Sequence, residues 1–285
     1  MGKIIWLASY LRSGNTWLRV FLRNYLLGTD KPVNINKLGG FIACDRTIFD
    51  DIVGVEAANL TFDEIEHYRP KVYENLATRN DEPILIKIHD AVTLTDEGYP
   101  IVSEQATLKA VYLIRNPLDV AVSLAHFFNT TTGKSIDYMA NSDAALNENR
   151  NKTSNWLRQR LLSWSEHVKS WIDQTYFPVH VVRYEDMVNK PVETFSSVTE
   201  FLGMGEDEAR IRKALEFSSF DILNKQEQSE GFREKPPQIE SFFRQGKAGS
   251  WHNELTDQQR DRIVADHTEV MRRFGYLTEN GEIVY

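Results

Sequence analysis

Residues 4–17 read Ile4-Ile5-Trp6-Leu7-Ala8-Ser9-Tyr10-Leu11-Arg12-Ser13-Gly14-Asn15-Thr16-Trp17. An apolar run rich in β-forming residues ends in a small polar loop, and apolar residues at helical spacing follow the loop. The pattern predicts a strand, a loop and a helix. The N–H groups and the dipole of a first helical turn favour an anion at such a junction. Gly14 lets the backbone approach a ligand closely, and Arg12 adds a fixed positive charge.

This stretch does not match the most familiar phosphate loop. No glycine precedes Gly14 at the distance that the Walker motif requires, and no Lys-Ser/Thr pair follows it. The stretch therefore indicates a phosphate loop of another type. Taken alone, it is also compatible with an ordinary capped turn that carries one surface arginine.

The composition is that of an ordinary globular chain. Its 285 residues are 41% hydrophobic and 26% charged, which suits one large α/β domain. The net charge of −8 argues against nucleic acid as a main partner. The single cysteine, Cys44, excludes an internal disulfide and fits a reducing compartment. With no recognisable signal peptide or apolar run of membrane-spanning length, we expect a cytoplasmic protein without a membrane partner.

Further along the chain, apolar runs and capping residues predict an alternation of strands and helices. Strands are expected at 83–88, 108–114 and 179–184. Helices are expected from Pro117, over 156–172, 192–202 and 206–217, and after a capping box formed by Thr256 and Gln259. Residues 31–79 look irregular, with scattered helix-like pieces such as 61–65. Residues 129–153 look like a mobile loop or lid, and 226–251 form a Gly- and Pro-containing stretch. The alternation predicts a single α/β domain over 1–285, with a mainly parallel, doubly wound central sheet flanked by helices.

Ligands of such sheets bind at the carboxyl ends of the strands. Lys87 and His89 follow the second expected strand and lie on one side of an extended backbone. Arg115 follows the third strand, and Tyr184 ends the fourth. Several cations and one histidine indicate a polyanionic ligand and one proton transfer, with His89 either the general base or a hydrogen-bonded structural residue. No carboxylate pair is well placed for Mg²⁺, which favours transfer stabilised by cations without a metal.

Several segments, in chain order from Ile4 to about Trp251, resemble motifs of the sulfotransferases that use 3′-phosphoadenosine 5′-phosphosulfate (PAPS). Residues 10–17 resemble the family's 5′-phosphosulfate loop, 87–89 its Lys-Thr-His, and 112–123 its 3′-phosphate motif. Further similar segments are 163–171, 183–186, 219–221 and 244–251. The resemblance therefore covers nearly the whole chain.

The resemblance implies sulfuryl transfer from PAPS to a hydroxyl or an amine of a small molecule, with 3′-phosphoadenosine 5′-phosphate (PAP) as product. It implies that the 5′-phosphosulfate is held by Arg12, Ser13, Gly14, Asn15 and Thr16. It implies that the 3′-phosphate is held by Arg115, Ser123, Arg244 and Gly246. The adenine site would comprise Trp17, Tyr184 and Phe220, with Ser218 as a hydrogen-bond partner. His89 would take the acceptor's proton, while Lys87 and Arg12 would stabilise charge on the sulfuryl oxygens and the departing phosphate.

The chain also departs from the family pattern. Arg12 stands where most members have lysine, which leaves open how it assists the leaving group. Gln245 replaces a basic residue, and Ser250 and His252 replace the usual aspartate and lysine. The family's short dimer motif is degraded near 252–261, so we expect a monomer or a weak homodimer.

The acceptor is less well indicated than the donor. We expect residues 31–79, 129–153 and 226–243 to bind it, although their sequence shows little pattern. Two other functions stay open: a nucleotide-dependent kinase on a P-loop-like scaffold, and a non-catalytic nucleotide-binding protein. A third alternative is that the acceptor is a tyrosine residue of a protein.

Overall fold

The computed structural model of the chain describes residues 2–148 and 154–285. The chain divides into two compact units, each built from segments that are distant in sequence. Unit 1 comprises Met1–Tyr10, Gly40–Tyr112 and Met139–Val181. Unit 2 comprises Leu11–Gly39, Leu113–Tyr138 and Val182–Tyr285.

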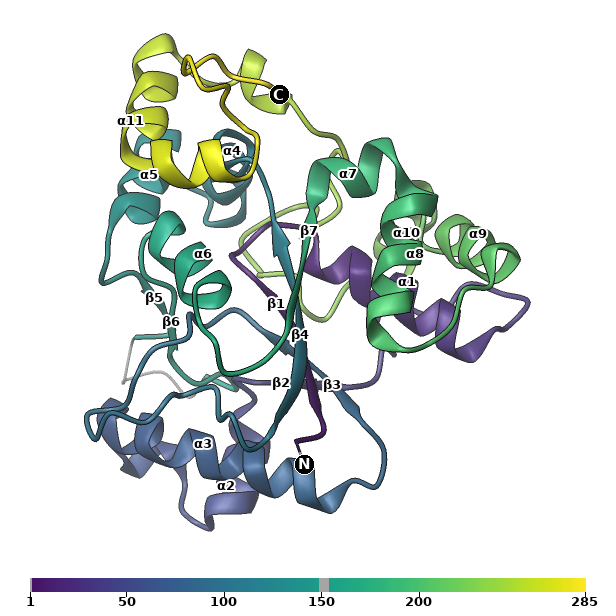
Figure 1. Cartoon of the computed structure of the whole chain (residues 1–285), viewed down its shortest axis with the longest axis vertical. Coiled ribbons are helices and arrows are strands. Elements are labelled where there is room, and N and C mark those ends of the chain that lie inside the picture. Colours follow the sequence, from purple (N-terminus) through teal and green to yellow (C-terminus); the bar gives the residue numbers. More distant parts are fainter. Residues whose placement is uncertain (1, 149–153) are drawn as a thin grey trace. The chain divides into compact units, whose positions relative to one another are not determined.

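A five-stranded, mainly parallel sheet runs in the order β2-β3-β1-β4-β7 (Figure 1). Its strands are β1 (Ile4–Ser9), β2 (Phe41–Ile42), β3 (Ile84–Ile88), β4 (Thr107–Ile114) and β7 (Val179–Arg183). Every residue of β1 is buried, as expected for a central strand whose two faces are both covered. Strands from later in the chain lie on both sides of β1. The predicted doubly wound sheet and its four expected strands are confirmed, whereas β2 was missed because two residues show no periodicity.

The helices of unit 1 include α2 (Arg46–Val53), α3 (Phe62–Arg79) and α6 (Trp164–Ile172), with the 3₁₀ turn η1 at Ala57–Asn59. Figure 1 shows α2 and α3 side by side. Trp6 of β1 meets Tyr73 of α3 edge to face, with 5.0 Å between the ring centroids. Tyr112 of β4 packs on Trp171 of α6 at 6.1 Å. Aromatic contacts thus join both helices to the sheet.

Unit 2 is mostly helical. Its helices are α1 (Asn15–Leu27), α4 (Pro117–Phe127), α7 (Tyr184–Asn189), α8 (Pro191–Leu202), α9 (Glu208–Phe217), α10 (Phe220–Glu230), η2 (Ser250–Asn253) and α11 (Asp257–Arg273). Helix α9 packs against α1 and α8, and α11 packs against α4. The predicted caps are present: Asn116 accepts from Leu118 N at the start of α4, and Thr256 and Gln259 form a capping box on α11. In the part of the chain that the structure describes, no helix is long and apolar enough to cross a bilayer.

The expectation that 31–79 is irregular was wrong in extent, because the helix-like piece at 61–65 is the start of a long helix. Helix α3 alone has 18 residues and begins with a capping box between Thr61 and Glu64. Pro70 lies inside it and argues locally against a continuous helix. Buried side chains such as Arg69 and Tyr73 on one face of α3 outweigh that penalty through tertiary contacts.

The helix predicted over 156–172 begins only at Trp164. Ser163 caps it together with Glu166, and Leu162 adopts a left-handed φ of 59°, which stops a helix from starting earlier. The preceding residues form β6 (Gln159–Arg160), which pairs antiparallel with β5 (Ala145–Leu146). The apolar stripe of this segment is nevertheless buried as predicted, from Leu157 through Trp171.

The predicted loop at 129–153 is more ordered than expected. It contains α5 (Thr132–Ala140) as well as β5, while residues 149–153 lie outside the described residues. Ser135 of α5 donates to Ala121 O at 2.7 Å, and both Ile136 and Met139 are buried. The segment is mostly polar, so its sequence gave little indication that these few side chains anchor it. Helix α10 likewise extends to Glu230, into the expected Gly- and Pro-containing stretch.

Candidate functional site

The loop between β1 and α1 adopts an unusual backbone conformation. Arg12 has a φ of 64° and Gly14 a φ of 98°, with a residue of negative φ between them. A Cβ atom on Gly14 would lie 2.8 Å from Cδ2 of Tyr184, so both the φ angle and the close approach require glycine. Such alternation of φ turns successive backbone N–H groups toward one point and favours an anion there.

Several buried polar atoms near this loop have no hydrogen-bond partner among the described residues. Ser13 is 1% exposed, and its Oγ makes no hydrogen bond to any described residue. The same is true, within 2–148 and 154–285, of Trp17 Nε1 and Arg115 Nε. The first turn of α1 contains no acidic residue, and Gly14 provides no side-chain cap. A buried hydroxyl and uncapped helical N–H groups fit a bound phosphate or sulfate group.

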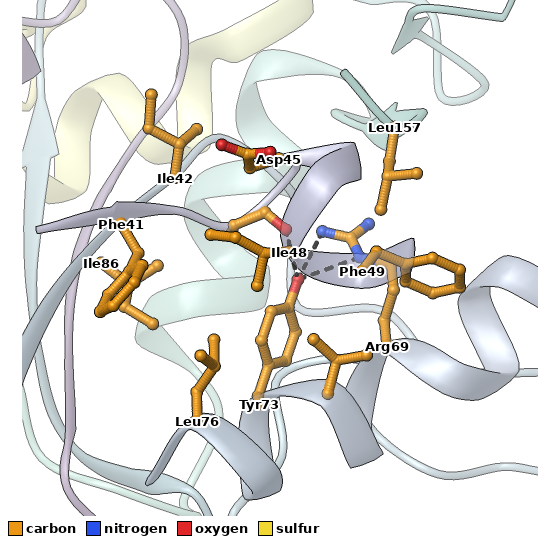
Figure 2. Close-up of a pocket in the computed structure, with 12 residues that line it drawn as sticks. Phe41, Ile42, Asp45, Ile48, Phe49, Arg69, Tyr73, Leu76, Ile86 and Leu157 are labelled. Atoms are coloured by element: carbon orange, nitrogen blue, oxygen red, sulfur yellow. Dashed lines mark hydrogen bonds between the residues drawn. The ribbon is translucent and has the colours of Figure 1, made fainter. Parts of the chain in front are cut away.

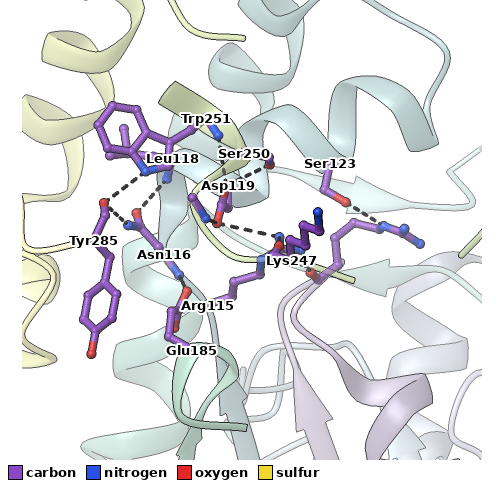
Figure 3. Close-up of polar contacts among 12 residues, drawn as sticks. Arg115, Asn116, Leu118, Asp119, Ser123, Glu185, Lys247, Ser250, Trp251 and Tyr285 are labelled. Atoms are coloured by element: carbon purple, nitrogen blue, oxygen red, sulfur yellow. Dashed lines mark hydrogen bonds and ion pairs between the residues drawn. The ribbon is translucent and has the colours of Figure 1, made fainter. Parts of the chain in front are cut away.

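Arg115 is a buried cation held by backbone carbonyls. Its Nη1 donates to Arg12 O and its Nη2 to Lys247 O, both at 3.1 Å (Figure 3). The guanidinium lies over the Tyr184 ring, 4.3 Å from the centroid. The nearest carboxylate oxygen, Oδ2 of Asp119, is 3.7 Å from Nη2. Its two terminal nitrogens thus donate to neutral carbonyls, and its ion pair with Asp119 is a long one.

Asp119 fixes the loop that returns to this region. Its carboxylate accepts from Gly249 N at 2.7 Å, from Ser250 Oγ at 2.9 Å and from Trp251 N at 3.1 Å (Figure 3). Ser250, one of the departures from the family pattern, is therefore part of this anchor. Glu185 plays a similar role, since it accepts from Asn116 N at 2.9 Å, and burial raises its pKa.

Arg12 is enclosed on several sides. Its Nε donates to Ser123 Oγ at 3.0 Å and its Nη2 to Phe242 O at 3.1 Å. Its guanidinium carbon lies 5.2 Å from the Phe127 ring centroid and 4.5 Å from that of Phe242. Burial, with the nearby charge of Arg115, lowers the pKa of Arg12 to about 10, so it stays cationic at neutral pH.

The aromatic residues expected at the nucleotide base also gather in unit 2. Trp17 meets Tyr184 edge to face at 6.1 Å. A Cβ atom on Gly246 would lie 2.5 Å from Phe220 Cδ2, so only glycine allows this approach. Ser218 is buried and donates to Ala214 O at 2.8 Å, which leaves its oxygen able to accept a hydrogen bond.

Arg244 lies at the edge of this set and is already paired. Its Nη2 is 3.2 Å from Oε1 of Glu254, whose other oxygen lies 2.9 Å from His126 Nε2. These hydrogen bonds and cations outweigh burial and lower the pKa of Glu254. Nothing in the sequence indicated Glu254, which lies ten residues from Arg244 and in no recognisable motif.

Lys87 and His89 belong to unit 1. Lys87 lies on β3 opposite Leu7 of β1 and is half-buried, and His89 follows the end of that strand. Nδ1 of His89 lies 2.8 Å from the carbonyl oxygen of Ser9 and 3.2 Å from Ser9 Oγ. Because a carbonyl oxygen can only accept, we assign the proton to Nδ1. The neutral ring then carries its basic lone pair on Nε2.

A second histidine supports the first. His167 of α6 is fully buried, and its Nε2 lies 3.0 Å from the carbonyl oxygen of His89. Nε2 is therefore the donor, and Nδ1 accepts from the Tyr112 hydroxyl at 2.8 Å. Burial lowers the pKa of His167 to about 4. A neutral, hydrogen-bonded imidazole thus anchors the backbone that carries His89.

The residue after His89 forms a buried ion pair that the sequence did not indicate. Both oxygens of Asp90 lie 2.7 Å from the terminal nitrogens of Arg69. Arg69 also donates to the Tyr73 hydroxyl, which in turn contacts Ala43 O at 3.2 Å (Figure 2). Arg160 N donates to Asp90 Oδ1 at 3.1 Å. This network joins α3, the end of β3 and the segment before α6.

A small cavity lies beside this network, lined mainly by apolar side chains of β2, α2 and α3 (Figure 2). Its volume of about 10 Å³ is enough for about one water molecule. It is therefore a packing defect rather than a substrate site. No group of three or more His, Cys, Asp or Glu side chains within 2–148 and 154–285 could hold a metal ion.

The residues expected from the sequence thus fall into two sets. Unit 2 brings together Arg12, Ser13, Gly14, Trp17, Arg115, Ser123 and Tyr184, and it also holds the Phe220–Gly246 contact. Asn15 and Thr16 are buried in the first turn of α1. Ser218 lies at the end of α9, and Arg244 is paired with Glu254. Unit 1 carries Lys87 and His89.

The two buried histidines should make the protein sensitive to acid. Burial lowers the pKa of His167 and of His267 from 6.5 to about 4, so the unfolded state binds more protons between these values. The free energy of unfolding is therefore unaffected by these groups above pH 6.5 and decreases as the pH falls toward 4. Each histidine should cost about 2 kcal/mol at pH 5 relative to pH 8.

Urea unfolding followed by circular dichroism at pH 8 and pH 5 measures this loss. His167→Gln and His267→Gln remove the titrating groups, so each should reduce the pH-dependent difference by about 2 kcal/mol. An unchanged difference in both variants would show that the histidines titrate normally in the folded protein.

Comparison with known proteins supports a family assignment. The family model described as "Sulfotransferase domain" matches residues 3–275. Sulfotransferase 1B1 of Canis lupus familiaris is 26% identical over 265 residues, which cover 90% of this chain and 79% of that protein. Flavonol 3-sulfotransferase of Flaveria bidentis is 24% identical over 274 residues, covering 91% and 78%.

Solved structures share the fold. Mouse sulfotransferase SULT7A1 complexed with PAP superimposes with a TM-score of 0.60 and 21% identity, covering 95% of this chain and 85% of that one. Retinol dehydratase in a complex with retinol and PAP gives a TM-score of 0.63 at 18% identity, covering 95% and 82%.

Proposed function

The chain belongs to the sulfotransferase family and transfers the sulfuryl group of PAPS to a small-molecule acceptor, and we propose the residues that carry each part of this reaction. The observation that carries the proposal is the buried Ser13 hydroxyl, which has no partner among the described residues at the uncapped start of α1. The neighbouring Arg115 and Arg12 supply the positive charge. Such a cradle suits the paired anionic groups of a nucleotide bisphosphate.

We assign the two ends of the nucleotide to different cations. Arg12 to Thr16 would bind the 5′-phosphosulfate through backbone N–H groups and side-chain donors. Arg115, Ser123, Arg244 and Gly246 would bind the 3′-phosphate. Arg244 would exchange Glu254 for the 3′-phosphate, which carries more negative charge than one carboxylate. Trp17, Tyr184 and Phe220 would hold the adenine, with Ser218 accepting a hydrogen bond.

His89 is the proposed general base. Its Nε2 would accept the acceptor's proton as the acceptor oxygen or nitrogen attacks sulfur. The bond between sulfur and the 5′-phosphate oxygen breaks, and its electron pair leaves with PAP. Lys87 and Arg12 would stabilise the negative charge on the sulfuryl oxygens and the leaving phosphate, as in phosphoryl transfer.

For the remaining partners, we propose that residues 31–79, 129–153 and 226–243 bind the acceptor. The net charge of −8 favours a small-molecule acceptor over nucleic acid. The degraded dimer motif supports a monomer or a weak homodimer. The single buried cysteine, Cys44, suits a cytoplasmic enzyme that makes no use of disulfides.

Calorimetric titration with PAP in the absence of Mg²⁺ tests the proposal. The wild type should bind PAP, and Arg115→Ala should weaken binding about 10- to 100-fold, because charged hydrogen bonds to phosphate are lost. Arg262→Ala, which removes a surface cation of α11, should leave the affinity unchanged. Circular dichroism would confirm that Arg115→Ala is folded. Binding of ATP only with Mg²⁺, and no binding of PAP, would overturn the assignment in favour of a kinase.

A further inference from the structure

The arginine that replaces the family's usual lysine lies against two aromatic rings. The Arg12 guanidinium lies 4.5 Å from the Phe242 centroid and 5.2 Å from that of Phe127. The same Phe242 also accepts a hydrogen bond from Arg12 Nη2 through its carbonyl oxygen. We propose that Phe242 is a positioning residue for sulfuryl transfer, which holds Arg12 in one orientation from both its ring and its backbone. This inference rests on the proposed function.

The contacts of Arg12 leave its Nη1 group to take part in the reaction. Nε is used by Ser123 and Nη2 by Phe242, whereas Nη1 takes part in neither bond. Rotation of the guanidinium is restricted, because it would break both bonds and leave the rings. The Nη1 group is therefore presented in a fixed direction. A preset donor of this kind stabilises developing charge without reorganisation during the reaction.

The backbone conformation of Arg12 is unfavourable unless other residues stabilise it. A φ of 64° is rare for a residue with a side chain and stores strain. The strained conformation persists only where its surroundings hold it. The ring contacts and hydrogen bonds of Ser123, Phe127 and Phe242 provide that support.

Phe242 is itself held by a buried carboxylate of α10. Glu227 is 5% exposed and accepts from Phe242 N at 2.7 Å and from Phe243 N at 2.9 Å. Ser241 Oγ donates to it at 3.3 Å, and Lys235 Nζ lies 3.5 Å away. Glu227 thus fixes the short segment whose carbonyl and ring contact Arg12.

The contacts of Arg12 with Ser123, Phe127 and Phe242, here called the Arg12 clamp, suit arginine and not lysine. A guanidinium is flat and delocalised, so it can stack on aromatic rings and donate in its own plane. The ammonium group of lysine is a compact point charge. It would be stabilised less than a guanidinium by the two rings and the carbonyl oxygen of Phe242. The clamp therefore explains how an arginine can act at this position.

A double-mutant cycle tests the coupling of Phe242 to Arg12. The assay follows radiolabelled PAPS as it is hydrolysed to PAP and inorganic sulfate, with water as the acceptor. Phe242→Leu keeps the backbone carbonyl and an apolar side chain but removes the ring. In the wild-type background we expect kcat to fall about tenfold while the KM for PAPS stays within twofold. In Arg12→Lys, the same substitution should change kcat less than twofold.

A phenylalanine outside every proposed binding segment serves as the control. Phe177 is buried just before β7 and packs on Trp171 of α6, with 6.1 Å between the ring centroids. Phe177→Leu should lower kcat by no more than twofold in both backgrounds. Equal loss of kcat from Phe242→Leu in both backgrounds would overturn the inference, since the ring would then act independently of Arg12.

Arginine side-chain ¹⁵N NMR gives a second measurement without turnover. The two Nη groups of Arg12 should give separate signals in the wild type and one averaged signal in Phe242→Leu. Separate signals in both proteins would contradict the clamp. Failure of the wild type to bind PAP would instead count against the proposed function, while the NMR result would still report on the clamp.

Discussion

His89→Asn should lower the turnover of acceptor sulfation by about 10²- to 10⁴-fold, the usual contribution of a general base. The Asn amide nitrogen can take the place of the imidazole Nδ1 and donate to the Ser9 carbonyl, which lies 2.8 Å from Nδ1. The variant therefore retains the local hydrogen bond and loses only the basic nitrogen. The measurement is kcat with the first acceptor found in a screen of phenols, alcohols and amines with PAPS.

Two comparisons separate a catalytic role of His89 from a structural one. PAP affinity should be unchanged in His89→Asn, because His89 is proposed to contact the acceptor and not the nucleotide. His180→Asn removes a half-buried histidine of β7, outside the segments proposed to bind substrate, and its kcat should match the wild type. If His89→Asn retained more than a tenth of wild-type turnover with normal stability, His89 would be a structural residue and another group would take the proton.

The parts of the site that could be predicted from sequence are those coded by neighbouring residues. The loop from Arg12 to Thr16 shows its function locally, since a strand, a glycine and a helix start lie within a few positions. Arg115 follows a buried strand and precedes a recognisable cap at Asn116. Such patterns are visible without knowledge of distant contacts.

The contacts that orient these residues could not be predicted, because they join distant positions. Glu227 and Phe242 lie 15 residues apart, and Phe242 lies 230 residues from Arg12. Asp90 and Arg69 lie on different elements, 21 residues apart. Neither pair forms a local pattern. The same limit explains the mistaken reading of α3, whose Pro70 is a strong local signal overruled by tertiary contacts.

A common feature links these unforeseen residues. Three buried carboxylates, Asp90, Asp119 and Glu227, each accept a backbone N–H from a distant segment of the chain: from Arg160, Gly249 and Phe242 respectively. An acidic total charge is thus compatible with a cationic site, because these acids serve as internal anchors. Their removal should harm the fold or the orientation of the site.

Asp90→Asn should lower the free energy of unfolding by about 3–5 kcal/mol, which makes it the most destabilising single change we expect. Arg69 is 1% exposed, and it would remain buried without its ionic partner. Asparagine offers one acceptor oxygen in place of two, and its NH2 group would face the guanidinium as a competing donor. Urea unfolding at pH 7 measures the loss.

Asp261→Asn is the matched control, since it removes a carboxylate of the same type from an exposed pair with Arg260 and should cost less than about 1 kcal/mol. A similar small loss in Asp90→Asn would mean that water or a shift of α3 relieves the buried Arg69. Replacing both partners, in Arg69→Met/Asp90→Leu, separates the two costs. This double variant should recover part of the stability, because no unpaired charge stays buried. Its sulfation turnover should stay low, because the polar anchor next to His89 is still missing, and a fully active double variant would show that Asp90 contributes to stability alone.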